Sequence, residues 1–178
     1  MIETRVRGSN RLSRMGSGRR AAMGERLGGY IYGTIVVLST TIAASRAYQH
    51  SLGHVAALVL ITSVVFWLAH VYAHAIARSV ASDQHLSRAT LAEIAHRESS
   101  IIEAAAIPIG ALLLGHFGIV SVNTALWLAV GSGLGVLAAQ GVAFARAERL
   151  GRLATLAIVA VNLGLGLTLV GLKLWVSH

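Results

Sequence analysis

The chain has 178 residues, of which 55% are hydrophobic and only 12% are charged, and its formal net charge is +8. Soluble domains carry roughly 25% charged residues, so this composition indicates an integral membrane protein. Cysteine is absent, which excludes a disulfide framework, a thiolate nucleophile and a zinc–thiolate site.

Residues 1–27 form a basic segment that is rich in glycine, serine and arginine and has no aromatic residue. This composition favours a disordered cytoplasmic tail that fixes the topology and contacts anionic lipid headgroups. Nucleic acid is the alternative partner for so much positive charge. We expect no nucleic-acid partner, because no aromatic side chains are interleaved with the arginines to stack bases.

Five apolar runs follow, each close to the length of about 20 residues that a spanning helix needs. They cover residues 28–45, 54–77, 101–122, 124–145 and 153–176. None alternates strictly between polar and apolar residues, as barrel strands would. The expected fold is therefore an all-α integral membrane protein with a five-transmembrane-helix bundle in residues 28–178. Cleavage of the first run as a signal peptide is the alternative, but its charged leader is long for such a signal.

The arginines lie almost entirely on one side of the membrane if all five runs span it. That side receives Arg5, Arg7, Arg11, Arg14, Arg19, Arg20, Arg26, Arg78, Arg88, Arg97, Arg146, Arg149 and Arg152. The other side receives only Arg46 and Lys173. The positive-inside rule then predicts a cytoplasmic N-terminus and an outside C-terminus. Of the 15 basic residues only Lys173 is a lysine, and this preference for arginine in codon usage indicates a GC-rich bacterial genome. We therefore expect a location in the bacterial cytoplasmic (inner) membrane.

The polar stretch before the third run predicts a helix that continues into the membrane. Thr90 and Glu93 have the spacing of a capping box, and neither glycine nor proline follows until Pro108. We expect an amphipathic helical segment over about 87–100 that runs unbroken into the third span and extends that helix into the cytoplasm. Pro108 is expected to kink it, because proline cannot donate to the carbonyl of Ala104.

Two histidines and a carboxylate lie inside apolar runs. His70 and His74 are one helical turn apart, so they face the same side of the second helix. Glu103 lies at a similar depth on the third helix, and a lone carboxylate facing hydrocarbon would be costly. We expect these three side chains to converge, with His96 and Glu93 on the same helical face as Glu103, at the cytoplasmic mouth.

Three functions compete for this cluster. It could bind or translocate a cation, as a channel or transporter for protons or for a divalent metal held by His70, His74 and Glu103. It could be structural, with hydrogen bonds that lock helices in a non-catalytic accessory subunit. It could also belong to a membrane-embedded metalloenzyme, because Glu93 and His96 have the spacing used in di-iron bundles, although the chain lacks a second such motif. We favour a non-enzymatic cation-handling protein with a divalent metal as the one candidate cofactor.

Small residues recur in the last two runs at spacings that suit close helix packing. Gly131, Gly135, Gly164 and Gly171 are the predicted contact positions, either inside one protomer or between copies. Five spans leave little surface for an enclosed pathway, so we expect a homo-oligomer in the lipid bilayer.

Overall fold

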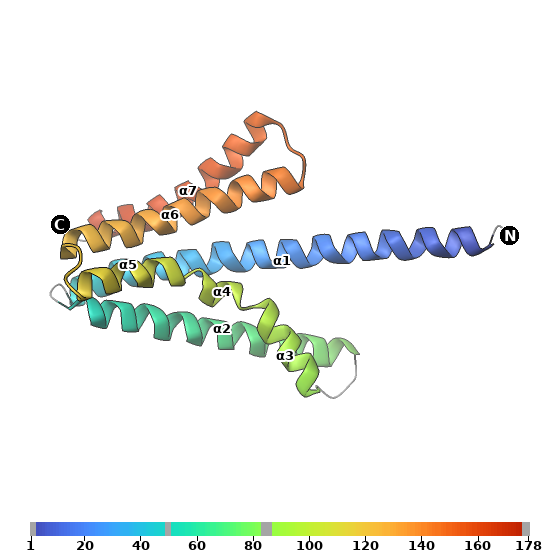
Figure 1. Ribbon diagram of the computed structural model, residues 1–178, viewed down its shortest axis with the longest axis horizontal. Coiled ribbons are helices and arrows are strands. Elements are labelled where there is room, and N and C mark those ends of the chain that lie inside the picture. Colours follow the sequence, from blue (N-terminus) through green and yellow to red (C-terminus); the bar gives the residue numbers. More distant parts are fainter. Residues whose placement is uncertain (1–2, 49–50, 83–86, 176–178) are drawn as a thin grey trace.

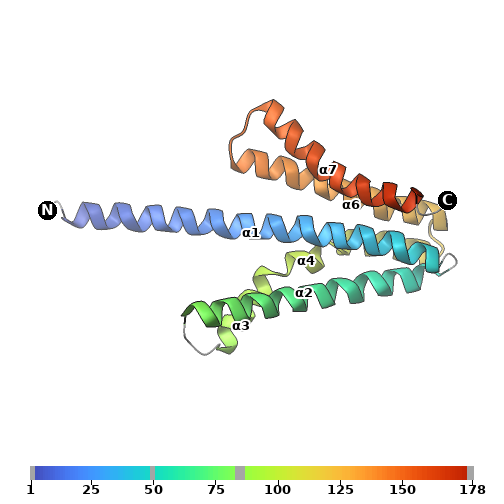
Figure 2. The same cartoon turned by 180° about the vertical axis from the view of Figure 1, so that it is seen from behind.

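The computed structural model describes residues 3–48, 51–82 and 87–175, and its regular structure in these ranges is all helical (Figure 1). In chain order the helices are α1 Glu3–Ala47, α2 Leu52–Ser82, α3 Arg88–Arg97, α4 Ser100–Glu103, α5 Ala106–His116, α6 Val122–Ala147 and α7 Arg152–Trp175. The all-α prediction is thus confirmed for the described residues. The start of α1 and the end of α7 lie at opposite ends of the molecule, which we call its N-terminal and C-terminal ends (Figures 1 and 2).

Three helical segments are long and apolar enough to cross a membrane, namely Met23–Ala47, Leu52–Ala81 and Val122–Ala147. A fourth candidate span arises if Arg88–Glu103 and Ala106–His116 are one span that is bent by 46°. The apolar part of α7, Arg152–Thr168, is shorter than these segments. Residue 176, the predicted last residue of this span, lies outside the described residues. The described chain therefore has three to four candidate spans, and these apolar helices indicate a multi-pass membrane protein.

Helix α1 corrects the expectation of a disordered N-terminal segment. One helix runs from Glu3 to Ala47, and its first part projects beyond the other helices (Figures 1 and 2). Helix formation is cooperative, so a spanning helix that is already nucleated gains one hydrogen bond for each residue added at its end. No proline interrupts this extension. The predicted boundary after residue 27 therefore falls within a helix.

The helix expected before the third span is present, but it is not unbroken. Ser87 caps α3, and its hydroxyl accepts from the backbone N–H of Thr90 at 3.1 Å. The helix stops after Arg97, where the Ser99 hydroxyl donates to the His96 carbonyl at 2.9 Å and competes with the backbone ladder. The prediction of a continuous helix was wrong because this local hydrogen bond favours a turn.

A second break separates α4 from α5 at Ala104 and Ala105. Pro108 lies one turn later and is buried. Its ring nitrogen has no hydrogen to donate to the Ala104 carbonyl, and regular bonding continues from the N–H of Ile109 to the carbonyl of Ala105 at 2.9 Å. The bend predicted for Pro108 is therefore present, four residues before the proline.

Side-chain caps and tight turns set the ends of α5 and α6. Ser121 is the N-cap of α6, and its hydroxyl accepts from the backbone N–H of Thr124 at 3.1 Å. At the end of α5, Gly118 has φ 74° and the N–H of Ile119 bonds to the carbonyl of Leu114 at 2.9 Å. This is a Schellman motif, which needs a left-handed residue after the helix. The same motif ends α6, where Arg149 occupies the left-handed position with φ 54°.

One left-handed position is occupied by glycine and the other by arginine, so substitutions at Gly118 and Arg149 should have opposite effects on stability. Arg149→Gly should raise the free energy of unfolding by about 1 kcal/mol, because glycine adopts positive φ without the steric cost that a Cβ brings. Gly118→Ala should lower it by about 1 kcal/mol for the same reason. Tryptophan fluorescence during heating of the detergent-purified protein would measure both changes.

Gly151→Ala is the control for these two variants, because Gly151 has no positive φ and a Cβ there would meet no atom within 4 Å. A melting temperature that falls for Arg149→Gly would contradict the expectation.

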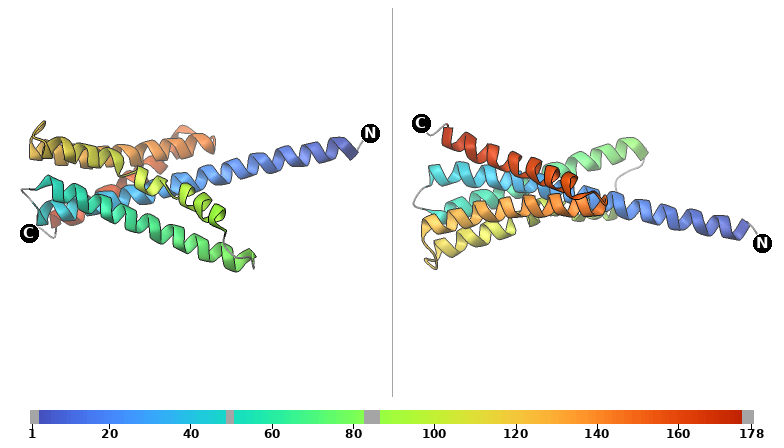
Figure 3. Two further views of the ribbon diagram at one scale, coloured as in Figure 1. Left: turned by 60° about the horizontal axis from the view of Figure 1, so that its bottom comes forward. Right: turned by 90° about the horizontal axis from the view of Figure 1, so that it is seen from above.

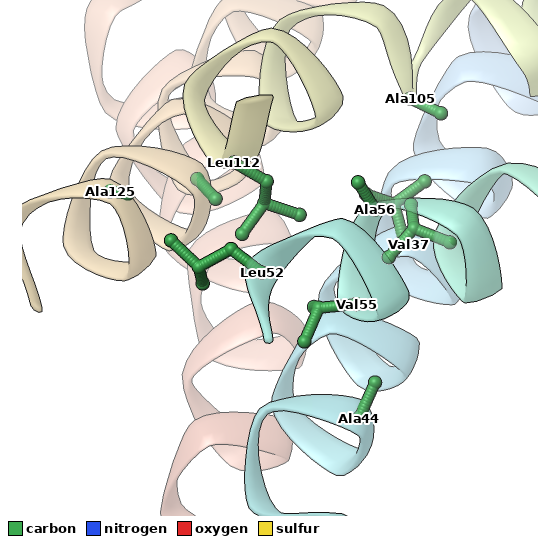
Figure 4. Packing of buried hydrophobic residues seen from close by; sticks show 10 residues of the cluster. Val37, Ala44, Leu52, Val55, Ala56, Ala105, Leu112 and Ala125 are labelled. Atoms are coloured by element: carbon green, nitrogen blue, oxygen red, sulfur yellow. The ribbon is translucent and has the colours of Figure 1, made fainter. Parts of the chain in front are cut away.

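Helix α1 is central to the packing, with α2 and α4 on one side and α6 and α7 on the other (Figures 1 and 3). A core of ten buried apolar residues, many of them small, joins α1, α2, α6 and the region of α5, and Figure 4 shows its packing: Val37, Ala44, Leu52, Val55, Ala56, Val59, Ala105, Leu112, Ala125 and Ala129. The end of α2, the start of α3 and the connection from α6 to α7 all lie toward the N-terminal end (Figure 1). The polar clusters described next are located beside this apolar core.

Candidate functional site

Glu103 is the last residue of α4, and its side chain is hydrogen-bonded to α1. Its carboxylate accepts from the Arg26 guanidinium at 3.0 Å and from the Tyr30 hydroxyl, and the Ser99 hydroxyl donates to it at 2.6 Å. Arg26 and Tyr30 are one helical turn apart, so they present both donors on one face of α1. We call these four residues the Glu103 cluster. It links α1 to the first break in the fourth candidate span.

Two glycines of α1 allow this close approach. A Cβ built on Gly33 would lie 2.8 Å from the Ile101 carbonyl oxygen and 3.2 Å from the Ala104 Cβ. A Cβ on Gly29 would meet the Ser100 hydroxyl. Gly29 and Gly33 therefore form a small-residue contact with α4, of the kind that brings membrane helices into backbone contact.

His70 and His74 lie away from the Glu103 cluster, on the face of α2 that turns toward α1 and α3. His70 Nδ1 donates to the Phe66 carbonyl at 3.0 Å, and His74 Nδ1 lies 3.2 Å from the His70 carbonyl. Since a carbonyl only accepts, Nδ1 carries the hydrogen in both rings. Nε2 is then the basic nitrogen that can take up a proton or bind a cation.

The carboxylate that His74 meets is Glu98. His74 Nδ1 lies 3.2 Å from Glu98 Oε1, and the Glu98 side chain is only 14% exposed. Glu98 follows the last residue of α3, and the turn there directs it toward α2. Trp67 steadies the same contact, because its indole N–H donates to the Ala95 carbonyl at 3.0 Å. The His74–Glu98 pair thus joins α2 to the end of α3.

A partly enclosed cavity of 290 Å³ adjoins this pair. Its walls come from α1, α2 and the end of α3, and its lining residues are Glu25, Gly28, Gly29, Tyr32, His70, His74 and Glu98. The Tyr32 and His70 rings lie 4.8 Å apart in a tilted arrangement. The cavity therefore combines two carboxylates, two imidazoles and an aromatic ring.

Two arginines line a second cavity next to this one. A neighbouring cavity of 200 Å³ shares Glu25, His74 and Glu98 with it and adds Arg78 and Arg97 to the lining. Arg97 lies 3.5 Å from Glu25.

Glu93 also binds both arginines, Arg97 at 2.6 Å and Arg78 at 3.5 Å, and each of these side chains is about half exposed. Such exposed pairs contribute about 0–1 kcal/mol. Glu93, predicted at the mouth of the site, therefore belongs to this surface network. His96 is exposed and lines neither cavity.

The structure brings together part of the predicted site. His70 and His74 share a cavity, as their spacing indicated, but they meet Glu98 and Glu25 there. Among the described residues, Glu103 has no hydrogen bond or ion pair with either histidine, because its carboxylate is occupied by α1. The sequence did not reveal Glu98 as a site residue, because residue spacing does not show how α3 is rotated about its axis relative to α2.

The predicted metal triad of His70, His74 and Glu103 is not assembled. In the part of the chain that the structure describes, no group of three or more His, Cys, Asp or Glu side chains could hold a metal ion. The Glu103 carboxylate is instead bound by Arg26, Tyr30 and Ser99.

The four glycines predicted for helix packing all point outward. A Cβ on Gly131, Gly135, Gly164 or Gly171 would meet no atom within 4 Å in the part of the chain that the structure describes, so these glycines make no close contact with its other helices. The glycines that do are offset from them, for example Gly133 against Leu38. Of the two alternatives for the predicted set, the contact between copies stays a prediction.

No protein-family model, curated protein or solved structure matches this chain. The chemistry of the site therefore has to be inferred from its own geometry. A titratable pair of imidazole and carboxylate, beside a cavity that carries further carboxylate charge, can hold a proton or another cation.

Proposed function

We propose that this chain is a small bacterial inner-membrane protein that binds or translocates a cation through its His/Glu cluster, and that the proton is the cation for which the cluster is best suited. The His74–Glu98 pair carries the proposal, because a carboxylate with a 14% exposed side chain lies 3.2 Å from an imidazole. An imidazole can accept a proton at one ring nitrogen and donate one from the other, and a carboxylate beside it can accept a proton, so the pair offers two adjacent proton-binding groups. His70, on the same cavity wall, is the next proton carrier.

The proposed topology has five spans, with the N-terminus in the cytoplasm and the C-terminus outside. The three long apolar helices, the bent pair and α7 would supply these spans. Arginines lie at the N-terminal end in α1, near the end of α2, in α3 and around the connection from α6 to α7, which supports a cytoplasmic position for that end. The projecting start of α1 would contact anionic headgroups near the bilayer, and the outward glycines would join copies into a homo-oligomer.

A structural accessory role is the second candidate, and the Glu103 cluster favours it. All acceptor capacity of this carboxylate is directed at α1 and Ser99, as expected of a contact that locks helices. In that case His74 and Glu98 would also serve packing, and the protein would conduct nothing by itself.

Proton flux into liposomes containing the purified protein separates the two candidates. Glu98→Gln and His74→Gln should each reduce the flux at least tenfold, since each removes one member of the proton-holding pair. Glu148→Gln is the matched control, because Glu148 is an exposed carboxylate after α6 and lies in neither cavity; its flux should be unchanged. Equal flux in all three variants and in protein-free liposomes would refute the transport proposal.

A further inference from the structure

The size of the cavity beside His70 and His74 points beyond a proton. Its volume is 290 Å³, and a water molecule occupies about 30 Å³ of liquid volume. A proton or a bare metal ion needs no such space, whereas the lower end of small-molecule pockets is about 300 Å³. The cavity therefore has room for a small organic molecule.

The charge of the cavity selects the sign of this molecule. Glu25 and Glu98 are the charged residues of its lining, which contains neither arginine nor lysine. Arg97 lies 3.5 Å from Glu25 and lines the neighbouring cavity, so it offsets part of the charge of Glu25. Glu98 has His74 as its ion-pair partner. With neutral imidazoles, the wall around Glu98 attracts a cation.

Aromatic rings on the same wall favour an organic cation in particular. Tyr32 and His70 both line the cavity with a ring-centroid distance of 4.8 Å, and the ring of Phe66, outside the lining, lies 5.8 Å from that of Tyr32. The face of a tyrosine ring attracts ammonium groups, and the attraction grows when water is excluded. A carboxylate and an aromatic face that border one small cavity are complementary to an alkylammonium or arylammonium ion.

The glycines supply the remaining wall. Gly28 lines the cavity, and a Cβ placed on it would meet no atom within 4 Å, so its missing side chain leaves free space there. Gly29 beside it is needed for the contact with Ser100. This stretch of α1 therefore exposes backbone to the cavity, which allows the apolar part of a ligand to lie flat against the helix.

We propose that this cavity binds a small organic ammonium ion, with its charged group between Glu98 and the ring of Tyr32 and its apolar part against Gly28. The inference uses the same site as the proposed function and adds a second kind of cation to it. Inorganic divalent cations are the competing ligand and are an arm of the test.

Calorimetric titration of the detergent-purified full chain with benzylammonium would test the proposal, with benzyl alcohol and magnesium chloride as separate titrants. Benzylammonium should bind, and neither of the other two should match it. Gly28→Leu should weaken binding at least tenfold by filling the cavity without changing any charge. Gly24→Leu is the matched control, because Gly24 also has open space around it but lies outside the cavity; its affinity should equal that of the wild type.

Two further variants test the polar contacts. Glu98→Gln should weaken binding about tenfold, as expected for the loss of a partly buried charge pair. Tyr32→Leu should weaken it about threefold to fivefold, the range of a cation–π contact. Should Glu98→Gln fail to fold, Gly28→Leu and Tyr32→Leu keep the proposal testable, since both retain every charge.

Equal binding of benzyl alcohol, binding of magnesium in place of benzylammonium, or benzylammonium binding that Gly28→Leu leaves unchanged would each overturn the inference. Glu98-dependent proton flux without benzylammonium binding would refute this inference alone. Benzylammonium binding without any flux would support it and refute only the transport proposal.

Discussion

Replacing Gly33 with valine is expected to destabilise the fold by about 3 kcal/mol, at the upper end of the cost of overpacking. Even a Cβ at this position would lie 2.8 Å from the Ile101 carbonyl oxygen and 2.9 Å from the Ile101 Cα. These are backbone atoms, which cannot rotate away, so α1 and α4 would have to separate. That separation would also lengthen the contacts of the Glu103 cluster. The fall in melting temperature should be about 10 °C by tryptophan fluorescence.

Two other glycines provide matched controls for this substitution. Gly110→Ala should be neutral or stabilising, because a Cβ there meets nothing within 4 Å and alanine favours a helix more than glycine does. Gly29→Ala should cost less than Gly33→Ala, because the atom it meets is the hydroxyl of Ser100, which can rotate. If Gly33→Val melted with the wild type, the close contact between α1 and α4 would be refuted.

Glu103→Gln is expected to lower the free energy of unfolding by about 2 kcal/mol while leaving proton flux intact. Hydrogen bonds to charged groups contribute about 1.5–3 kcal/mol each, and the partial exposure of Arg26 and Glu103, 50% and 38%, reduces the ionic part. A glutamine amide has only one oxygen to accept from Tyr30 and Ser99. Its NH2 group would face the Arg26 guanidinium, and both of these groups are donors. The melting temperature and the flux should be measured on the same preparation.

Glu93→Gln is the control, since Glu93 is also paired with arginine but belongs to the exposed network. Its effect on unfolding should stay below about 1 kcal/mol. Loss of flux in Glu103→Gln with an unchanged melting temperature would reverse the assignment and make Glu103 a transport residue.

Composition and hydropathy were sufficient to predict the membrane-type all-α fold, because apolar runs of spanning length leave few other structures. The bend near Pro108 was also predicted, because the missing N–H of a single proline decides it. Disorder of the N-terminal segment was wrongly predicted, because glycine and serine content was weighed above the continuity of a helix from the membrane outward.

The site was predicted only in part, because its assembly depends on rotation about helix axes. His70 and His74 share a face by spacing alone, and that much follows from 3.6 residues per turn. Their carboxylate partner, Glu98, could not be predicted in the same way, because spacing does not show which face of α3 lies against α2. The exposed positions of Gly131 and Gly135 have the same cause. The spacing of small residues shows that they share one face of a helix, but it does not show which helix packs against that face.

The break at Ala104 and Ala105 also divides one helix dipole into two. The amino end of α5, with its unsatisfied N–H groups and partial positive charge, then lies within the bundle, two residues beyond Glu103. Glu103 lies between this positive end and the carboxyl end of α4, whose partial charge is negative, so the two dipole fields offset each other there. The sign of the charge at this position is therefore set by the Arg26 guanidinium, 3.0 Å from the carboxylate. A lysine would face that guanidinium with a like charge, so Glu103→Lys should be more damaging than Glu103→Gln.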